Sequence, residues 1–338
     1  MEPHLESRSS RKLQIAVLCG GPSAERLISL KSGSAVARAL AEFGHSVSEI
    51  DPAVVDVSGL DWGPFDLAFI ALHGKFGEDG QIQQILETAL IPYTGSPVAA
   101  SRLAFSKSAS KERFAQHQVP TAPYVLIHEA DTVDRIVRQA EQLGFPLVVK
   151  PDTQGSSLGV SIVRQPADLP AALAACFHYD SFGLLEQALT GSEWTVGLID
   201  DRALPAIRIE TDRTFFDYEA KYEDNETRYQ FDFDVPAEQV DSIVQAARNA
   251  CSAVGTSGLA RVDLILDQSG EPQVLEVNTV PGLTDHSLVP KAAARLGMSL
   301  ADLCQECVQS ALQHHSAWLR QCRNSTKKTK RSRRDRLA

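Results

Sequence analysis

The N-terminal part of the chain alternates short apolar segments with segments of helical spacing, and this alternation restricts the fold most. LQIAVLC (residues 13–19) is an apolar run that ends at Gly20-Gly21 and precedes helical spacing from Ser29 to Phe43. HSVSEID and DLAFIAL are predicted as the next two strands, and a helix is predicted from about Gln81 to Ala89. Strands that alternate with helices favour a parallel sheet covered by helices.

The rest of the chain shows a different order of elements. Helical spacing at 101–117 and 131–143 precedes a strand, FPLVVK, then a glycine-rich turn and a second strand, VSIV. The last part has strands in LLEQAL and EWTVGLI, a polar aromatic stretch at 213–230 and a helix from about Ala237 to Gly255. ARVDLILD and QVLEVNT flank QSGEP and are predicted as a β-hairpin. A chain of 338 residues is too long for one compact core and suits two or three domains, and the order of elements favours three α/β parts.

The charge of the chain is divided unevenly between its body and its C-terminal end. The net charge is −10, but residues 321–338 carry eight Lys or Arg and one acid, which leaves −17 for the remainder. An acidic body argues against a nucleic-acid-binding surface. The basic end is interpreted as a disordered solubilising extension, and weak contact with RNA or an anionic surface stays open as the alternative.

Composition places the chain among cytoplasmic globular proteins. The apolar fraction of 43% and the charged fraction of 22% are ordinary for that class. The opening segment MEPHLESRSSRK has no apolar core, so it is not a signal peptide, and no stretch is apolar enough for a membrane span. The six cysteines are scattered, which favours a reducing compartment over a disulfide scaffold. Cys304 and Cys307 fall on one face of a predicted helix and are interpreted as structural rather than zinc-binding.

The predicted hairpin carries polar residues that could bind a metal. Residues two apart in a strand point to the same side, so Arg261 shares a face with Asp263, and Glu276 shares a face with Asn278. Leu275 and Val277 are predicted on the opposite face. If the two polar faces coincide, their oxygen ligands suit Mg²⁺, whose remaining ligands are usually waters and substrate phosphates. The alternative is a solvated face of an edge hairpin.

Two loops could bind ligands. In VVKPDTQGSSLGVSIV (residues 148–163), a strand ends on Lys150 and a loop with Gly155, Ser156, Ser157 and Gly159 follows, which suits phosphate oxygens. A plain flexible hairpin turn is the alternative. The loop CGGPSAER leads into a helix N-terminus and carries Glu25, which would suit a substrate ammonium. His73 follows the third strand, where open α/β sheets place ligand groups, although a lone histidine is more often structural.

These motifs together resemble those of the D-alanine–D-alanine ligases of the ATP-grasp superfamily. The matching stretches are CGGPSAER, ALHGKFGEDG, PYTGS, VVKP…GSSLGV, YEAKY, GLARVDL and LEVNTVPGLTDHSLVP, in the same order from about residue 13 to about 310. The resemblance implies a three-domain ATP-grasp architecture, α/β at the N-terminus and α+β in the later parts. The expected divisions are a disordered tail (1–12), a parallel-sheet domain with the D-alanine pocket (13–97), a central ATP-grasp domain (98–186), a C-terminal catalytic domain (187–322) and a disordered basic tail (323–338).

The resemblance also implies a role for each site residue. Those expected to contact ATP are Lys107, Lys150, Ser157, Glu186, Glu193 and Lys221. Asp263, Glu276 and Asn278 match metal ligands, with two Mg²⁺ or Mn²⁺ ions expected. Those that match the amino-acid sites and the group that stabilises the tetrahedral intermediate are Glu25, His73, Arg261, Gly282, Ser287 and Leu288. Ser156 and Tyr222 match partners that close a loop over the site together with Glu25.

The implied activity is ATP- and Mg-dependent ligation of two D-alanine molecules through an acyl phosphate, for peptidoglycan precursor synthesis. The resemblance further implies a cytoplasmic homodimer, with no membrane partner and no nucleic acid. Val280, Asp285 and Gln187 depart from residues common in the family, without removing a catalytic role. A ligase that makes a depsipeptide or D-Ala-D-Ser is one alternative, which Tyr222 disfavours. A non-catalytic nucleotide-binding module is another, and a degenerate copy should have lost Arg261 or a metal ligand.

Overall fold

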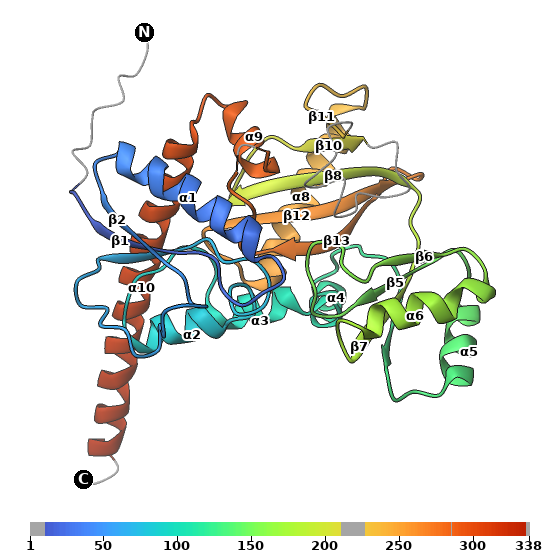
Figure 1. Cartoon of the computed structure of the whole chain (residues 1–338), viewed down its shortest axis with the longest axis horizontal. Helices are drawn as coiled ribbons and strands as arrows, with labels where there is room; N and C mark the ends of the chain where they lie inside the picture. Colours follow the sequence, from blue (N-terminus) through green and yellow to red (C-terminus); the bar gives the residue numbers. More distant parts are fainter. Residues whose placement is uncertain (1–10, 211–226, 285, 336–338) are drawn as a thin grey trace.

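The structure is a computed structural model that describes residues 11–210, 227–284 and 286–335, with side chains up to Arg320. It contains three β-sheets, each with its own helices (Figure 1). The N-terminal sheet and the central sheet lie on opposite sides of the view, and the β-sheet of the C-terminal part lies between and above them. The predicted fold class, with a parallel N-terminal sheet and mixed later parts, is confirmed.

The N-terminal sheet has the order β2-β1-β3, and both pairings are parallel. Its strands are apolar and its core lies on both faces, because helices cover each side. Its elements are β1 (Gln14–Leu18), α1 (Arg26–Glu42), β2 (Ser46–Ile50), β3 (Leu67–Ile70) and α2 (Gln81–Thr88). Two short helices, α3 (Val98–Phe105) and α4 (Lys107–Gln116), follow where the sequence predicts one helical segment. The break is at Ser106, whose side chain accepts a hydrogen bond from the Ala109 N–H and caps α4.

The central sheet is antiparallel, with the order β4-β7-β5-β6. Its apolar face packs against two helices and forms a separate core cluster. Its elements are β4 (Tyr124–His128), α5 (Val133–Leu143), β5 (Leu147–Pro151), β6 (Ser161–Val163), the 3₁₀ helix η1 (Pro166–Asp168), α6 (Leu169–Phe177) and β7 (Phe182–Gln187).

The C-terminal sheet has the order β11-β10-β8-β12-β13, with β9 paired to β8, and its pairings are antiparallel. One face packs on α8, where Trp194 is completely buried and contacts Phe233 edge to face. Its elements are β8 (Gly191–Ile199), β9 (Arg202–Ala203), β10 (Ile207–Glu210), β11 (Arg228–Gln230), α8 (Ala237–Val254), β12 (Leu259–Asp267), β13 (Pro272–Asn278) and α9 (Leu288–Ala294).

The last helix, α10 (Leu300–Asp335), returns to the N-terminal sheet and packs against α1. Its first turns bury Leu303, Cys304, Cys307 and Val308 in the core shared with that sheet. Figure 1 shows the end of α10 projecting away from the three sheets. The helix includes residues 323–335, for which a disordered tail is predicted from the sequence. This part has no Gly or Pro, its Lys and Arg residues have good helix propensity, and basic residues are favourable at a helix C-terminus.

Candidate active site

The β12–β13 hairpin brings the predicted metal-binding residues onto one surface. In its antiparallel register Arg261 pairs with Asn278, and Asp263 pairs with Glu276, so the two polar faces coincide as the hypothesis required. A β-bulge follows, because Asp263 opposes Glu276 while the next residue, Leu264, opposes Val274. The extra residue is Leu275, which lines the same cleft as Glu276. The prediction that Leu275 shares the core face with Val277 is therefore wrong, since a bulge shifts the alternation by one residue.

Asp263 is held by two neighbouring side chains. Arg261 donates two hydrogen bonds to it, from Nε to Oδ1 at 2.9 Å and from Nη2 to Oδ2 at 2.7 Å. Thr195 on β8, which is 1% exposed, donates from Oγ1 to Oδ1 at 2.6 Å. The bidentate pair fixes the guanidinium in the plane of the carboxylate. Arg261 is thus positioned by the residue two places along its own strand.

The donor set on this surface fits a hard divalent cation. The candidate ligands are the carboxylates of Asp263 and Glu276 and the amide oxygen of Asn278. Within the described residues, no group of three His, Cys, Asp or Glu side chains is placed to hold a metal, so these two carboxylates have no third such partner. The side-chain oxygen of Asn278 is oriented by a hydrogen bond of 2.9 Å from the Val280 N–H, which leaves it acceptor capacity. Arg261 already places a positive charge against Asp263. An all-oxygen set with few protein ligands is what Mg²⁺ and Mn²⁺ use beside phosphates.

The glycine-rich loop after β5 is tied to the start of α4. Asp152 accepts hydrogen bonds from the Ser108 N–H at 2.7 Å and from the Ser106 hydroxyl at 2.8 Å. Its backbone oxygen accepts from the Lys107 N–H at 3.1 Å. An acid at a helix N-terminus satisfies unpaired N–H groups and interacts favourably with the helix dipole. Asp152 thereby fixes the first residue of α4 relative to the loop.

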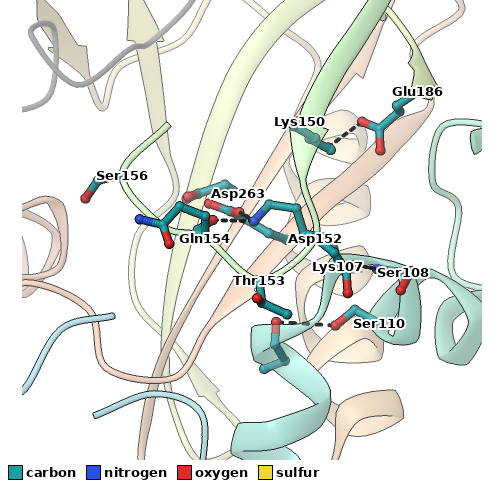
Figure 2. Close-up of polar contacts among 12 residues, drawn as sticks. Lys107, Ser108, Ser110, Lys150, Asp152, Thr153, Gln154, Ser156, Glu186 and Asp263 are labelled. Atoms are coloured by element: carbon teal, nitrogen blue, oxygen red, sulfur yellow. Dashed lines mark hydrogen bonds and ion pairs between the residues drawn. The ribbon is translucent and has the colours of Figure 1, made fainter. Parts of the chain in front are cut away.

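Lys107 lies at the junction of two clefts. Its ammonium donates to the Gln154 carbonyl oxygen at 2.6 Å and is 3.7 Å from the Glu276 carboxylate. Figure 2 shows Lys107 directed at Gln154 and Lys150 directed at Glu186. Lys107, Gln154 and Glu276 line both clefts, so the two are continuous.

The first cleft extends between the central and C-terminal sheets and contains about 1140 Å³ of space, part of it open to solvent. Its walls combine apolar side chains from β5, β6, β12 and β13 with charged groups. The predicted nucleotide-binding residues on it are Lys107, Lys150, Ser157, Glu186 and Glu193, and the metal-ligand candidates on it are Asp263 and Glu276. Apolar walls with a few charged groups suit a flat heterocycle joined to phosphates.

Glu186 is buried between two lysines. The Lys150 ammonium donates to its Oε1 at 2.8 Å, and the Lys111 ammonium lies 2.7 Å from its Oε2. Burial raises the pKa of Glu186, but the charges of Lys150 and Lys111 outweigh it, so the pKa lies below its ordinary value. The carboxylate is therefore held in its ionised form.

The second cleft contains about 980 Å³ of space, part of it open to solvent, and the predicted amino-acid-binding residues line it. Glu25, 8% exposed, accepts a hydrogen bond from the Ser156 hydroxyl, so the N-terminal domain contacts the glycine-rich loop there. Gly74 has φ +72°, and a Cβ on it would lie 2.5 Å from Glu25 Oε2, so a side chain there would displace the carboxylate. The remaining candidates on this cleft are His73, Arg261, Asn278, Gly282, Ser287 and Leu288.

His73 and Ser287 are fixed by their neighbours. One ring nitrogen of His73, Nε2, is 3.0 Å from the Ser32 hydroxyl, and Nδ1 is 3.0 Å from the Val280 carbonyl oxygen. His73 thus lines the cleft and also joins the N-terminal sheet to the loop after β13. The Ser287 hydroxyl is 2.9 Å from that of Thr284 and accepts from the Thr284 N–H at 3.1 Å.

Lys221 and Tyr222 lie outside the described residues, as does Asp285. The structure adds three residues that sequence reasoning missed: Lys111, Asp152 and Thr195. Of these three, only Lys111 could have been found from the sequence, because it lies four positions after Lys107 and residues at that spacing share a helix face. Cys304 and Cys307 are buried and unpaired, in agreement with the structural interpretation, and burial raises the pKa of the Cys304 thiol to about 12.

Comparison with known proteins finds two family models that match the chain. The family model described as D-ala D-ala ligase C-terminus matches residues 114–309, and the one described as D-ala D-ala ligase N-terminus matches residues 56–96. A D-alanine–D-alanine ligase of Geobacter sulfurreducens is 43% identical over 301 residues, covering 88% of this chain and 94% of that protein.

Two solved structures show the same fold. The crystal structure of the D-alanine–D-alanine ligase from Bacillus anthracis complexed with ATP has a TM-score of 0.78 and 30% identity, covering 90% of this chain and 99% of that one. The VanG D-Ala:D-Ser ligase from Enterococcus faecalis has a TM-score of 0.78 and 26% identity, covering 89% and 100%. Along the described residues, none of the helices is both long and apolar enough to cross a membrane.

Proposed function

The chain belongs to the D-alanine–D-alanine ligase family, and we therefore propose that it joins two D-alanine molecules to D-alanyl-D-alanine at the expense of ATP. The observation that carries this proposal is the continuity of the two clefts at Lys107 and Glu276. A nucleotide in the first cleft would bring its terminal phosphate to the amino-acid cleft. This geometry is what activation of a carboxylate by phosphoryl transfer needs.

A carboxylate and an amine do not condense in water, so the carboxylate must first be activated. In the proposed first step, an oxygen of the first D-alanine carboxylate attacks the γ-phosphorus of ATP, and ADP leaves. The amine of the second D-alanine then loses a proton and attacks the acyl carbon, and phosphate leaves as the amide bond forms. Both steps concentrate negative charge at the junction of the clefts, where Lys107 and Arg261 supply positive charge.

The residues of the site divide these tasks. Lys107 and Lys150 would bind phosphates. Glu186 would bind the base and Glu193 the ribose, while Ser157 would contact the nucleotide from the glycine-rich loop. Asp263, Glu276 and Asn278 would hold one or two Mg²⁺ or Mn²⁺ ions, which would neutralise phosphate charge when bound. Glu25 and His73 would bind the first D-alanine. Ser287 and Leu288 would bind the carboxylate of the second, while Arg261 and the Gly282 N–H would stabilise the tetrahedral oxyanion.

Several features of the cellular setting are also proposed. The product would serve peptidoglycan precursor synthesis, and the protein would act in the cytoplasm as a homodimer. The cysteines Cys19, Cys176, Cys251, Cys304 and Cys307 are unpaired and buried, which supports a reducing compartment. The domain division at residues 97, 186 and 322 is likewise proposed, and the three sheets support it.

The test is phosphate release with ATP and Mg²⁺ in the presence of D-alanine, with L-alanine as the control and mass spectrometry of the product. We expect D-alanine-dependent phosphate release with one dipeptide formed per phosphate, and loss of both signals when EDTA removes the metal. An absence of dipeptide with D-alanine, at any Mg²⁺ or Mn²⁺ concentration, would exclude the proposed activity.

The same assay tests the choice of the second substrate. Tyr222, outside the described residues, carries a phenol rather than a cationic side chain, so it would not repel an incoming ammonium. We expect D-Ala-D-Ala and essentially no D-Ala-D-lactate from equal D-alanine and D-lactate between about pH 6 and 9. D-serine is included as a third competitor, and a dominant D-Ala-D-Ser product would assign the chain to that specificity instead.

A further inference from the structure

Lys111 on α4 is a buried cation for which the proposed reaction has no direct use. It is 1% exposed, and no surface of its side chain reaches solvent. Its ammonium lies 2.7 Å from Glu186 Oε2, donates to the Thr121 hydroxyl at 2.6 Å and to the Ala122 carbonyl oxygen at 3.2 Å, and sits 5.6 Å from the centre of the Tyr124 ring. Burying a lysine so completely costs free energy unless its partners compensate.

The two lysines that flank Glu186 differ in their access to the cleft. Lys150 lines the nucleotide cleft together with Glu186, so it can turn toward a bound phosphate. Lys111 is enclosed, and its three oxygen partners hold it in place. If a bound nucleotide drew Lys150 away, Lys111 would be the cation left against Glu186.

Lys111 is also anchored across two sheets. The Thr121 hydroxyl that accepts from Lys111 donates to the Val274 carbonyl oxygen at 2.6 Å, and the Val274 N–H donates to the Pro120 oxygen at 2.8 Å. Val274 lies on β13 next to the bulge, and Glu186 lies on β7. Lys111 therefore keeps Glu186 at a constant position relative to both walls of the cleft.

We propose that Lys111 is a positioning residue that keeps Glu186 ionised and oriented, and that it thereby sets the preference for a 6-aminopurine nucleotide over a 6-oxopurine one. The proposal rests on the proposed function in one respect, that the purine base lies against Glu186. An ionised carboxylate only accepts hydrogen bonds, so it pairs with the amino group of adenine and repels the O6 of guanine. A protonated carboxyl group could donate to O6, and the discrimination would be lost.

The electrostatic surroundings support this role. Burial lowers the pKa of Lys111 to about 8, while the charge of Glu186 opposes that shift, so the lysine remains protonated at neutral pH. The groups that face Glu186 are Lys111 from α4 and Lys150 from β5, with the Tyr124 ring of β4 behind Lys111. Burial raises the pKa of Glu186, and the charge of Lys111 is one of the two that counteract this effect. Removing Lys111 should therefore raise the pKa of Glu186.

The experiment measures equilibrium binding of ADP and of GDP to the full-length protein with Mg²⁺, in wild type and in Lys111→Met, at several pH values from about 5.5 to 7.5. For wild type we expect a preference for ADP that does not change with pH. For Lys111→Met we expect the ratio of the two dissociation constants to fall about tenfold or more, the range for a hydrogen bond to a charged group. The ratio should fall further as the pH is lowered, because Glu186 then becomes protonated.

Matched variants separate this role from a structural one. Lys107→Met, one turn earlier on α4, removes a phosphate contact shared by both nucleotides, so it should weaken ADP and GDP by similar factors and leave the ratio unchanged. Glu186→Gln should lose the preference at every pH. Adding Lys111→Met to Glu186→Gln should change the ratio no further, because the lysine acts through the carboxylate.

Lys111→Gln retains a donor for Thr121 and removes only the charge, so it serves if the methionine variant does not fold. An unchanged, pH-independent ratio in a folded Lys111→Met or Lys111→Gln protein would overturn the proposal. Failure of wild type to bind ADP would instead overturn the proposed function together with it. A wild-type protein that binds ADP and GDP equally would refute the selectivity claim while leaving ligation testable by phosphate release.

Discussion

Glu276 lies where the first and second clefts join, opposite Asp263 and 3.7 Å from the Lys107 ammonium. Its side chain is about one-third exposed, so its charge faces the cleft rather than the core. Strand alternation places it on the same face as Asn278, and the bulge at the neighbouring residue turns Leu275 toward the same cleft.

Glu276→Gln tests the metal assignment, since it preserves the shape of the side chain and removes one charge from the proposed metal-binding set. We expect the rate of phosphoryl transfer to fall by roughly 10²-fold or more, the order found when one electrostatic contact to the transition state is removed. The thermal midpoint should change little, because the side chain is not part of the core. Activity is measured by phosphate release as the Mg²⁺ concentration is varied.

Glu271→Gln is the matched control, because Glu271 is exposed at the turn of the same hairpin. It should behave as wild type at every metal concentration. Turnover of the Glu276 variant close to wild type at limiting Mg²⁺ would contradict its assignment as a metal ligand.

At the scale of elements, α10 has two parts with different surroundings. The first part buries Ala301, Leu303, Cys307, Val308 and Ala311 in the core shared with the N-terminal sheet. Its later part contains residues 323–335, which have seven basic side chains and no apolar ones. Only the first part has an apolar face that tertiary packing can stabilise.

Truncation after Arg320 should therefore leave fold and ligase activity intact. Circular dichroism should show a thermal midpoint near that of the full chain, and phosphate release should be the same at matched protein concentration and salt. A chain that ends at Ser299 is the control, and we expect it to unfold because it lacks the buried face of α10. Loss of activity after removal of residues 321–338 alone would show that the basic end is part of the enzyme.

At the scale of the whole molecule, the site is assembled from all three sheets. Glu25 and His73 follow strands of the N-terminal sheet, Lys150 and Glu186 belong to the central sheet, and the hairpin residues belong to the C-terminal one. The contact between Glu25 and Ser156 spans 131 positions of sequence and joins the N-terminal domain to the glycine-rich loop. An acyl phosphate would be protected from water only if these parts stay together.

Ser156→Ala should weaken this contact and uncouple ATP hydrolysis from ligation. We expect kcat/KM for D-alanine to fall by about tenfold, as for a hydrogen bond to a charged group, and phosphate release to exceed dipeptide formation. Parallel measurement of phosphate and dipeptide gives the ratio. Ser181→Ala, at an exposed serine of the central domain, is the control and should keep the ratio at one. A ratio of one in Ser156→Ala would show that the Glu25 contact does not retain the intermediate.

The sequence by itself determined the type of most elements and the hairpin that carries the candidate metal ligands, and it left open whether the two polar faces of that hairpin coincide. Arg261 and Asp263 could be predicted to share a face of one strand, and Glu276 and Asn278 a face of the other, because strand periodicity and a short turn are local properties. The parallel N-terminal sheet followed for the same reason, from strands that alternate with helices.

Only the tertiary structure decided the features that depend on contacts between distant segments. The bulge at Leu275 is one such feature, because only the pairing of β13 with β12 shows that the Leu275 side chain lines the cleft instead of the core. The burial of Lys111 is another: its spacing from Lys107 marks a shared helix face, but the packing of α4 in the assembled chain decides that Lys107 meets the cleft and Lys111 meets Glu186 on β7. Charge and hydrogen-bond partners follow from burial, and burial is a property of the assembled chain.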